Sequence, residues 1–283
     1  MTMPGPCVAE EGYNCRCFLW PVRCRGKGKE CSMKITDISF QRNGHHLHAQ
    51  LLLPDEGQGP YPAVILSHGF NGSGDHGIPY AEAFVRAGMA GVVFDFIGGS
   101  MDSKSGGHMT QMSVQTELAD LLDVLEHVKA LPQIDEQRIW LFGRSQGGLV
   151  SAMAAAQCPE TVKGLILLYP AFNLPDMIRN GWPDPAQVPE ETEILGAVVG
   201  RKYYDDLISL DPAELQTAYG GPVLIIQGQK DTTVPPQTAE DAARRYAQCT
   251  LLRLPEAQHG FAGADLTRAE EASVQFIMPY ISA

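Results

Sequence analysis

Short apolar runs alternate with helix-like stretches along most of the chain, and this alternation predicts the fold class. The runs that resemble buried strands cover residues 63–66, 90–94, 138–142, 164–169, 222–227 and 250–254. Between them, residues 113–130 place four leucines and a valine on one face at helical spacing. Strands and helices that alternate in this way predict an α/β protein whose mostly parallel, doubly wound sheet is covered by helices on both faces.

The first two strand-like segments predict a different local arrangement. Residues 34–40 and 45–53 both alternate polar and apolar side chains, and Asn43-Gly44 lies in the short connection between them. Two alternating segments joined by such a turn are typical of a β-hairpin. We therefore expect an N-terminal antiparallel hairpin at the start of the sheet.

Residues 171–219 interrupt the alternation. The stretch is rich in proline and carries the aromatic residues Phe172, Trp182, Tyr203, Tyr204 and Tyr219. It lies between two predicted strands, so an insertion there should rise above the carboxyl ends of the strands. We interpret it as a small cap insertion, because plain surface loops of this length are uncommon in compact domains.

The first 32 residues do not continue the pattern. They hold five of the seven cysteines, with several glycines and prolines and no apolar periodicity. The cysteine spacing lacks the repeated C-x2-C pairs of zinc sites, although a small disulfide or metal knot stays open as an alternative. We expect residues 1–32 to be a disordered extension outside the fold, and residues 33–283 to form the α/β domain.

Charge and cysteine content limit the partners and the compartment. The 283 residues carry a formal net charge of −12 and no basic run, which argues against nucleic acid as a partner. No apolar stretch approaches the roughly 20 residues that span a bilayer, so we expect no membrane association. Only Cys158 and Cys249 lie in the predicted domain, which favours a reducing, cytoplasmic location.

The strand over residues 138–142 leads into a serine motif. Gly143-Arg144-Ser145-Gln146-Gly147 matches the G-x-S-x-G nucleophile elbow, and a helix-forming stretch follows it. In such an elbow the serine sits on a sharp turn, and the two glycines allow the strand and the helix to approach closely. We therefore predict that Ser145 is a catalytic nucleophile.

An acid and a base follow in the order Ser, Asp, His that is typical of this motif. Asp231 lies in the loop after the apolar run 222–227, and His259 follows the run 250–254. Loops at the carboxyl ends of neighbouring parallel strands open at one edge of the sheet, so we expect both side chains to meet Ser145. His68 also follows a strand, but in a His-Gly-Phe loop it more often braces the backbone.

The same edge should supply an oxyanion hole. One N–H group is expected from Gln146, directly after the nucleophile, and the other from Phe70, in the loop after residues 63–67. No cluster of His, Asp or Glu has metal-ligand spacing, and no Gly-rich dinucleotide motif opens a helix. We therefore expect neither a metal nor a cofactor.

Taken with these motifs, the chain resembles the bacterial cinnamoyl and feruloyl esterases of the α/β-hydrolase superfamily, which carry a small inserted cap. The matching pieces are Ser67-His68-Gly69-Phe70, Phe94-Asp95-Phe96, the elbow, residues 228–235 and His259-Gly260-Phe261. The resemblance implies that cap residues hold a phenolic hydroxyl of the substrate, and Asp176 and Tyr203 match those positions loosely. Arg144 departs from the histidine that is usual before the serine, and residues 96–100 depart from the usual glycine spacing.

These observations predict a carboxylic ester hydrolase that acts through an acyl-serine on hydroxycinnamoyl (ferulate or coumarate) or other small acyl esters. The alternatives are a serine peptidase of the oligopeptidase type, a thioesterase, a monoacylglycerol-type lipase, or a non-enzymatic scaffold with a hydrolase fold. The expected partner is a small-molecule ester, and a homodimer stays open.

Overall fold

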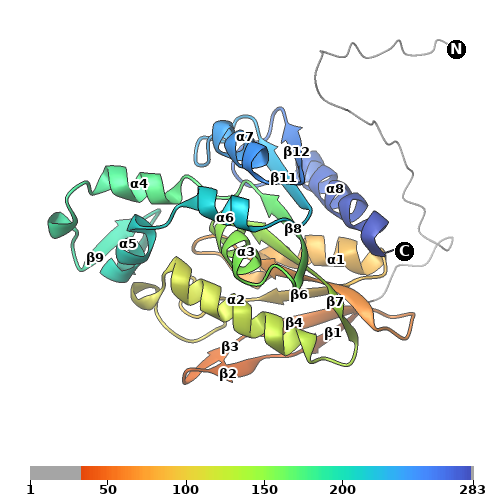
Figure 1. Cartoon of the computed structure of the whole chain (residues 1–283). Helices are drawn as coiled ribbons and strands as arrows, with labels where there is room; N and C mark the ends of the chain where they lie inside the picture. Colours follow the sequence, from red (N-terminus) through yellow and green to blue (C-terminus); the bar gives the residue numbers. More distant parts are fainter. Residues whose placement is uncertain (1–32, 282–283) are drawn as a thin grey trace, which may run out of the picture. The chain divides into compact units, whose positions relative to one another are not determined.

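An eight-stranded sheet forms the centre of the part of the chain that the computed structural model describes, residues 33–281 (Figure 1). The predicted extension over residues 1–32 lies outside the described residues. In spatial order the strands are β1 (Met33–Asp37), β4 (Ala49–Pro54), β6 (Ala90–Phe94), β5 (Tyr61–Ser67), β7 (Ile134–Arg144), β8 (Val162–Leu168), β11 (Val223–Gly228) and β12 (Cys249–Leu254). From β6 to β12 all neighbours are parallel, whereas β4 is antiparallel to both β1 and β6, which confirms the mostly parallel sheet.

The N-terminal hairpin is present, but it divides into two ladders. β1 pairs with β4 in the main sheet, from Met33 opposite Pro54 to Asp37 opposite Gln50. The tip forms a separate ribbon of β2 (Phe40–Arg42) and β3 (His45–Leu47). Asn43 and Gly44 at its turn both have positive φ, 47° and 81°, which is the backbone that a two-residue hairpin turn requires.

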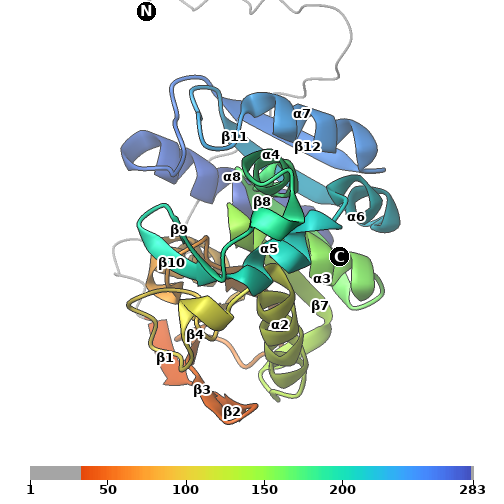
Figure 2. The same cartoon turned by 90° about the vertical axis from the view of Figure 1, so that its left-hand side faces the viewer.

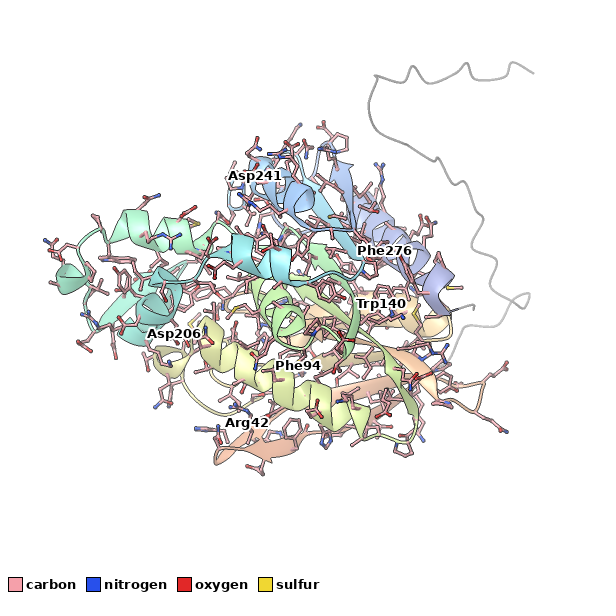
Figure 3. The ribbon with its side chains drawn as sticks, in the orientation of Figure 1. Arg42, Phe94, Trp140, Asp206, Asp241 and Phe276 are labelled. Atoms are coloured by element: carbon pink, nitrogen blue, oxygen red, sulfur yellow. The ribbon has the colours of Figure 1, made fainter. Side chains whose placement is uncertain are left out.

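Helices cover both faces of the sheet, as the alternating pattern predicts (Figure 1). The apolar side chains of α1 (Ile78–Arg86) and α8 (Gly263–Ile281) pack on one face, and those of α2 (Val114–Lys129), α3 (Gln146–Gln157) and α7 (Pro236–Arg245) pack on the other. Trp140 of β7 and Phe276 of α8 show this packing in Figure 3, with ring centroids 5.9 Å apart. Within residues 33–281, no helix combines the length and apolar character that crossing a bilayer requires.

The cap stretch, residues 171–219, has its own secondary structure. It consists of α4 (Leu174–Gly181), the short η3 (Pro185–Gln187), a hairpin of β9 (Glu191–Ile194) and β10 (Ala197–Gly200), α5 (Arg201–Ile208) and α6 (Pro212–Ala218). In Figure 2, α4, α5 and the hairpin face the viewer in front of the sheet. α6 instead contacts α3 and α7, so the end of the stretch belongs to the helical layer on the sheet.

Candidate active site

Ser145 lies at a sharp turn between β7 and α3, with φ 53° and ψ −120°. This backbone is strained for a residue with a side chain and is typical of functional turns. The flanking glycines are required sterically. A Cβ on Gly143 would overlap the backbone of Gly147, and a Cβ on Gly147 would overlap the carbonyl oxygens of Ser67 and His68. The predicted elbow is therefore present in backbone geometry.

The structure brings the three predicted triad side chains into one hydrogen-bonded chain. The Ser145 Oγ–H donates to His259 Nε2 over 3.1 Å, and the His259 Nδ1–H donates to Asp231 Oδ2 over 2.8 Å. The carboxylate can only accept, so it sets the tautomer that leaves Nε2 free to take the serine proton. These contacts join three loops that lie far apart in the sequence.

Asp231 is fixed by the loop between β11 and α7. Its Oδ1 accepts hydrogen bonds of 2.9 Å from the N–H groups of Thr233 and Val234, and Oδ2 faces His259. Burial alone would raise the pKa of this carboxyl, but the hydrogen bonds from His259 and the loop outweigh it and hold the pKa below its usual value. Asp231 is therefore ionised, as a partner for an imidazolium must be.

An aromatic side chain packs against the His259 ring. The ring of Tyr169 lies with its centroid 4.7 Å from that of His259. Arg144 Nε donates to the Tyr169 hydroxyl over 2.9 Å, and Arg144 Nη1 donates to the His76 carbonyl oxygen over 2.9 Å. Arg144, the residue that departs from the usual histidine, thus anchors the tyrosine that packs on His259.

The predicted oxyanion donors lie next to Ser145. A Cβ on Gly69 would be only 3.2 Å from the Ser145 Cβ, so the loop that carries Phe70 passes directly beside Ser145. Gln146 is the first residue of α3, where N–H groups have no partner inside the helix. Among the described residues, neither the Phe70 nor the Gln146 N–H has a hydrogen-bond acceptor. Both groups are available to a developing oxyanion.

His68 braces this loop. Its Nε2 accepts the Phe96 N–H over 3.1 Å, so Nδ1 carries the proton and donates to the Gly69 carbonyl oxygen over 2.8 Å. Burial lowers the pKa of His68 to about 4, although the bond to Gly69 and the nearby Asp95 act in the opposite direction. His68 therefore stays neutral at neutral pH and ties two strand-end loops together.

The two predicted cap residues occupy different environments. The carboxylate of Asp176 is exposed and pairs with Arg179 on the same helix at 2.7 Å. Tyr203 is buried, and its hydroxyl donates to the side-chain Oε1 of Gln146 over 2.5 Å. The structure thus brings Tyr203 to the elbow and shows no contact between Asp176 and the triad among residues 33–281. As a substrate contact, each stays a prediction.

Sequence reasoning missed Glu117, which lies beneath the elbow. This α2 side chain is buried, and its Oε2 accepts a hydrogen bond of 2.8 Å from Gln146 Nε2. A signal was present in the sequence, because Glu117 lies one helical turn before Leu121 on the apolar face of the predicted helix. Within residues 33–281, no three His, Cys, Asp or Glu side chains come together as a metal site.

Comparison with known proteins identifies the family and the fold of the chain. A model described as the Prolyl oligopeptidase family (Peptidase_S9) matches residues 78–281. The solved structure of Est1E from Butyrivibrio proteoclasticus with bound ferulic acid superposes with a TM-score of 0.81, at 27% identity, covering 87% of this chain and 100% of that chain. The fold is thus that of the α/β hydrolases.

Two curated relatives match over shorter regions. An uncharacterized 31.7 kDa protein from the traX-finO intergenic region of Escherichia coli is 38% identical over 130 residues, which is 44% of this chain and 42% of that protein. Protein bem46 of Schizosaccharomyces pombe is 26% identical over 210 residues, which is 74% of this chain and 64% of that protein. The matched regions span less than two thirds of either relative.

Proposed function

Because this chain belongs to the prolyl oligopeptidase family and has the α/β-hydrolase fold, we propose that it is a serine hydrolase that cleaves carboxylic esters of small acyl groups. The observation that carries the proposal is the unbroken hydrogen-bonded chain from Asp231 through His259 to Ser145. A serine hydroxyl is a weak nucleophile at neutral pH and needs an adjacent, correctly oriented base. This arrangement supplies both the base and the group that orients it.

In the first half of the proposed reaction, Ser145 Oγ attacks the ester carbonyl carbon while His259 Nε2 takes the hydroxyl proton. The carbonyl oxygen gains negative charge and accepts hydrogen bonds from the N–H groups of Phe70 and Gln146. The tetrahedral intermediate collapses, His259 gives its proton to the leaving alkoxide, and an alcohol departs. An acyl-serine ester remains.

In the second half, water replaces the alcohol. His259 takes a proton from the water as it attacks the acyl carbon, and the same oxyanion hole stabilises the second intermediate. Collapse breaks the bond to Ser145 Oγ, which regains its proton from His259. The products are a carboxylic acid and free enzyme, and no cofactor is consumed.

We place the substrate among hydroxycinnamoyl esters such as those of ferulate and coumarate. The support is the likeness to Est1E, whose structure holds ferulic acid, together with a tyrosine of the cap at the elbow. A site that hydrogen-bonds a phenolic hydroxyl discriminates strongly against substrates that lack it. Asp176→Ala should then reduce the preference for methyl ferulate over methyl cinnamate and leave p-nitrophenyl acetate hydrolysis unchanged. An unchanged preference would remove Asp176 from the substrate site.

The second candidate is peptide hydrolysis, which the family match favours. The two candidates share the triad and differ in the leaving group. A panel of methyl ferulate, p-nitrophenyl esters of rising chain length, a monoacylglycerol, an acyl thioester and an aminoacyl amide separates them. We expect methyl ferulate to give the highest kcat/KM and the amide no turnover. Turnover of the amide at a rate comparable to the ester would identify a peptidase.

Further proposals concern the extent of the catalytic domain, the location of the protein and its partner. We propose that residues 33–283 are the catalytic domain, that the protein acts in the cytoplasm, and that its partner is a small ester. A chain that starts at Met33 should keep the kcat/KM of the full chain on p-nitrophenyl acetate. If this shortened chain is folded and pure but has lost activity, part of residues 1–32 belongs to the catalytic unit.

A further inference from the structure

The side chain of Gln146 is held at both ends in the protein interior. Its Nε2 donates to Glu117 Oε2 of α2 over 2.8 Å, and its Oε1 accepts from the Tyr203 hydroxyl of α5 over 2.5 Å. All three residues are buried, with at most 2% of each exposed. The backbone N–H of this same glutamine is one of the two proposed oxyanion donors. The orientation of Gln146 therefore depends on two helices, α2 of the main layer and α5 of the cap.

Tyr203 also contacts the second proposed donor. Its ring centroid lies 5.9 Å from that of Phe70, at an interplanar angle of 60°. Burial raises the pKa of Tyr203 well above its usual value, so the hydroxyl keeps its proton and acts as a donor. One cap side chain thus packs against the Phe70 ring and holds the Gln146 amide.

α5 is itself attached to α2 near this cluster. Ser113, the N-cap residue of α2, donates its hydroxyl to Asp206 Oδ2 of α5 over 2.5 Å. Glu117 follows Ser113 by about one helical turn. Figure 3 labels Asp206 on α5 near the start of α2. The position of α5 on α2 therefore determines where the Tyr203 hydroxyl lies.

Glu117 completes the cluster as an uncharged acceptor. Burial raises the pKa of its carboxyl to about 8, although the hydrogen bond from Gln146 opposes the shift and the nearby Asp120 adds to it. Glu117 Oε1 has no partner among the described residues. A buried polar group without a partner destabilises the folded state, and an apolar side chain of similar size would fill the space at less cost. Packing alone thus does not account for a carboxyl group here.

We propose that Tyr203 and Glu117 are positioning residues for the oxyanion hole. The position of the cap helix α5 on α2 then determines the geometry of the Gln146 and Phe70 N–H groups. This inference rests on the proposed serine hydrolase function. Donors aimed at the oxyanion act because they are held in place before the charge develops. A shift of one donor by about 1 Å can reduce a rate by about 10²-fold.

The test compares two matched pairs of variants. Tyr203→Phe removes the hydroxyl that holds Gln146, whereas Tyr204→Phe removes a buried hydroxyl of the same helix, one that donates to the Trp182 carbonyl oxygen over 3.2 Å. Glu117→Leu removes the acceptor for Gln146, whereas Glu117→Gln keeps an acceptor oxygen and the size of the neutral carboxyl group. Circular dichroism and the Tm establish that each variant is folded.

The decisive readout is inhibition by an aryl trifluoromethyl ketone. This probe forms a hemiketal with the serine, and the hemiketal oxyanion occupies the hole as in the transition state. We expect Tyr203→Phe and Glu117→Leu to raise Ki and lower kcat/KM by the same factor, roughly ten- to hundred-fold. Tyr204→Phe should match the wild type, and Glu117→Gln should recover most of the loss.

A purely structural role would give a different result. Loss of folded protein lowers kcat but leaves Ki unchanged, because Ki does not depend on the amount of active enzyme. An unchanged Ki in Tyr203→Phe and Glu117→Leu, or an equal change in Tyr204→Phe, would overturn the positioning proposal. Wild-type protein that neither cleaves esters nor binds the ketone would instead overturn the proposed function, and the positioning proposal with it.

Discussion

The carbonyl oxygen of His68 occupies the space that a side chain on Gly147 would need. His68 directly follows β5 and begins the proposed oxyanion loop, and Gly147 is the second residue of α3, the helix that follows Ser145. The two segments touch through their backbones, so Ser145 and the proposed oxyanion loop are held at a fixed separation. A residue with a Cβ at position 147 must move one of them.

Gly147→Ala should therefore damage both stability and catalysis. Overpacking of this kind typically costs about 1–3 kcal/mol in stability, and displacement of the loop should lower kcat on p-nitrophenyl acetate. Gly220→Ala is a suitable control, because a Cβ there meets no atom within 4 Å. Urea unfolding and steady-state kinetics measure the two effects. A Gly147→Ala enzyme that matches the control in both would show that the elbow tolerates a side chain.

The sequence revealed the sheet and the elbow because both depend on local rules. The apolar run before Ser145 and the glycines around it determine a strand, a tight turn and a helix. Asp231 and His259 could be found because each follows a strand whose carboxyl end lies at the same edge of the sheet. Their hydrogen bonds to each other and to Ser145 follow once all three loops lie at that edge of the sheet.

The rest of the site depends on contacts that no local pattern encodes. The contact between Tyr203 and Gln146 joins residues 57 positions apart through the docking of a cap helix. The alternating pattern predicted one hairpin, but it could not show that the tip of the hairpin leaves the main sheet, because each predicted segment, 34–40 and 45–53, runs without a break through residues of both ladders. The short cap strands had no pattern long enough to distinguish them from loop.

His68 should make the protein less stable in acid. Its pKa is lowered from 6.5 to about 4, so the stability it contributes is complete above pH 6.5 and is lost as the pH falls toward 4. As the pH falls over this interval, the free energy of unfolding should decrease more steeply in the wild type than in His68→Gln. The difference between the two slopes should be at most about 1.4 kcal/mol per pH unit. Urea unfolding at several pH values measures the difference. Equal slopes would show that His68 is protonated in the folded state.

Glu117 should have the opposite effect. Its pKa is raised from 4.5 to about 8, so the folded state keeps a proton that the unfolded chain has lost. Stability is therefore complete below pH 4.5 and is lost as the pH rises toward 8. The groups near the Glu117 carboxyl are Asp120 on its own helix, Tyr203 on α5 and the uncharged Gln146 on α3.

Glu117→Gln has no proton to lose, so its stability relative to the wild type should increase between about pH 5 and 8. The increase should reach at most about 1.4 kcal/mol per pH unit. Chemical unfolding of both proteins in the same buffers measures it. A constant difference across this range would mean that the carboxyl is ionised throughout and that the cluster carries a charge.

His259 should determine the acid limb of the activity profile. A general base works only when it is neutral, so kcat/KM should rise as the pH increases from the acid side. His68→Gln should keep this limb, because His68 contacts backbone groups and not Ser145. His259→Ala should abolish the limb together with most of the rate. A limb that disappears in His68→Gln and survives in His259→Ala would reverse the two assignments.

The central claim is that Ser145 forms a covalent acyl intermediate, and labelling with a fluorophosphonate tests it most directly. Intact-mass measurement of the wild type should show one added label, and peptide mapping should place it on Ser145 alone. Ser145→Ala should take up no label and should lose about 10³-fold or more in kcat on p-nitrophenyl acetate, as removal of a triad nucleophile does. Label on another residue, or a Ser145→Ala enzyme that keeps more than about a tenth of the wild-type rate, would contradict the account.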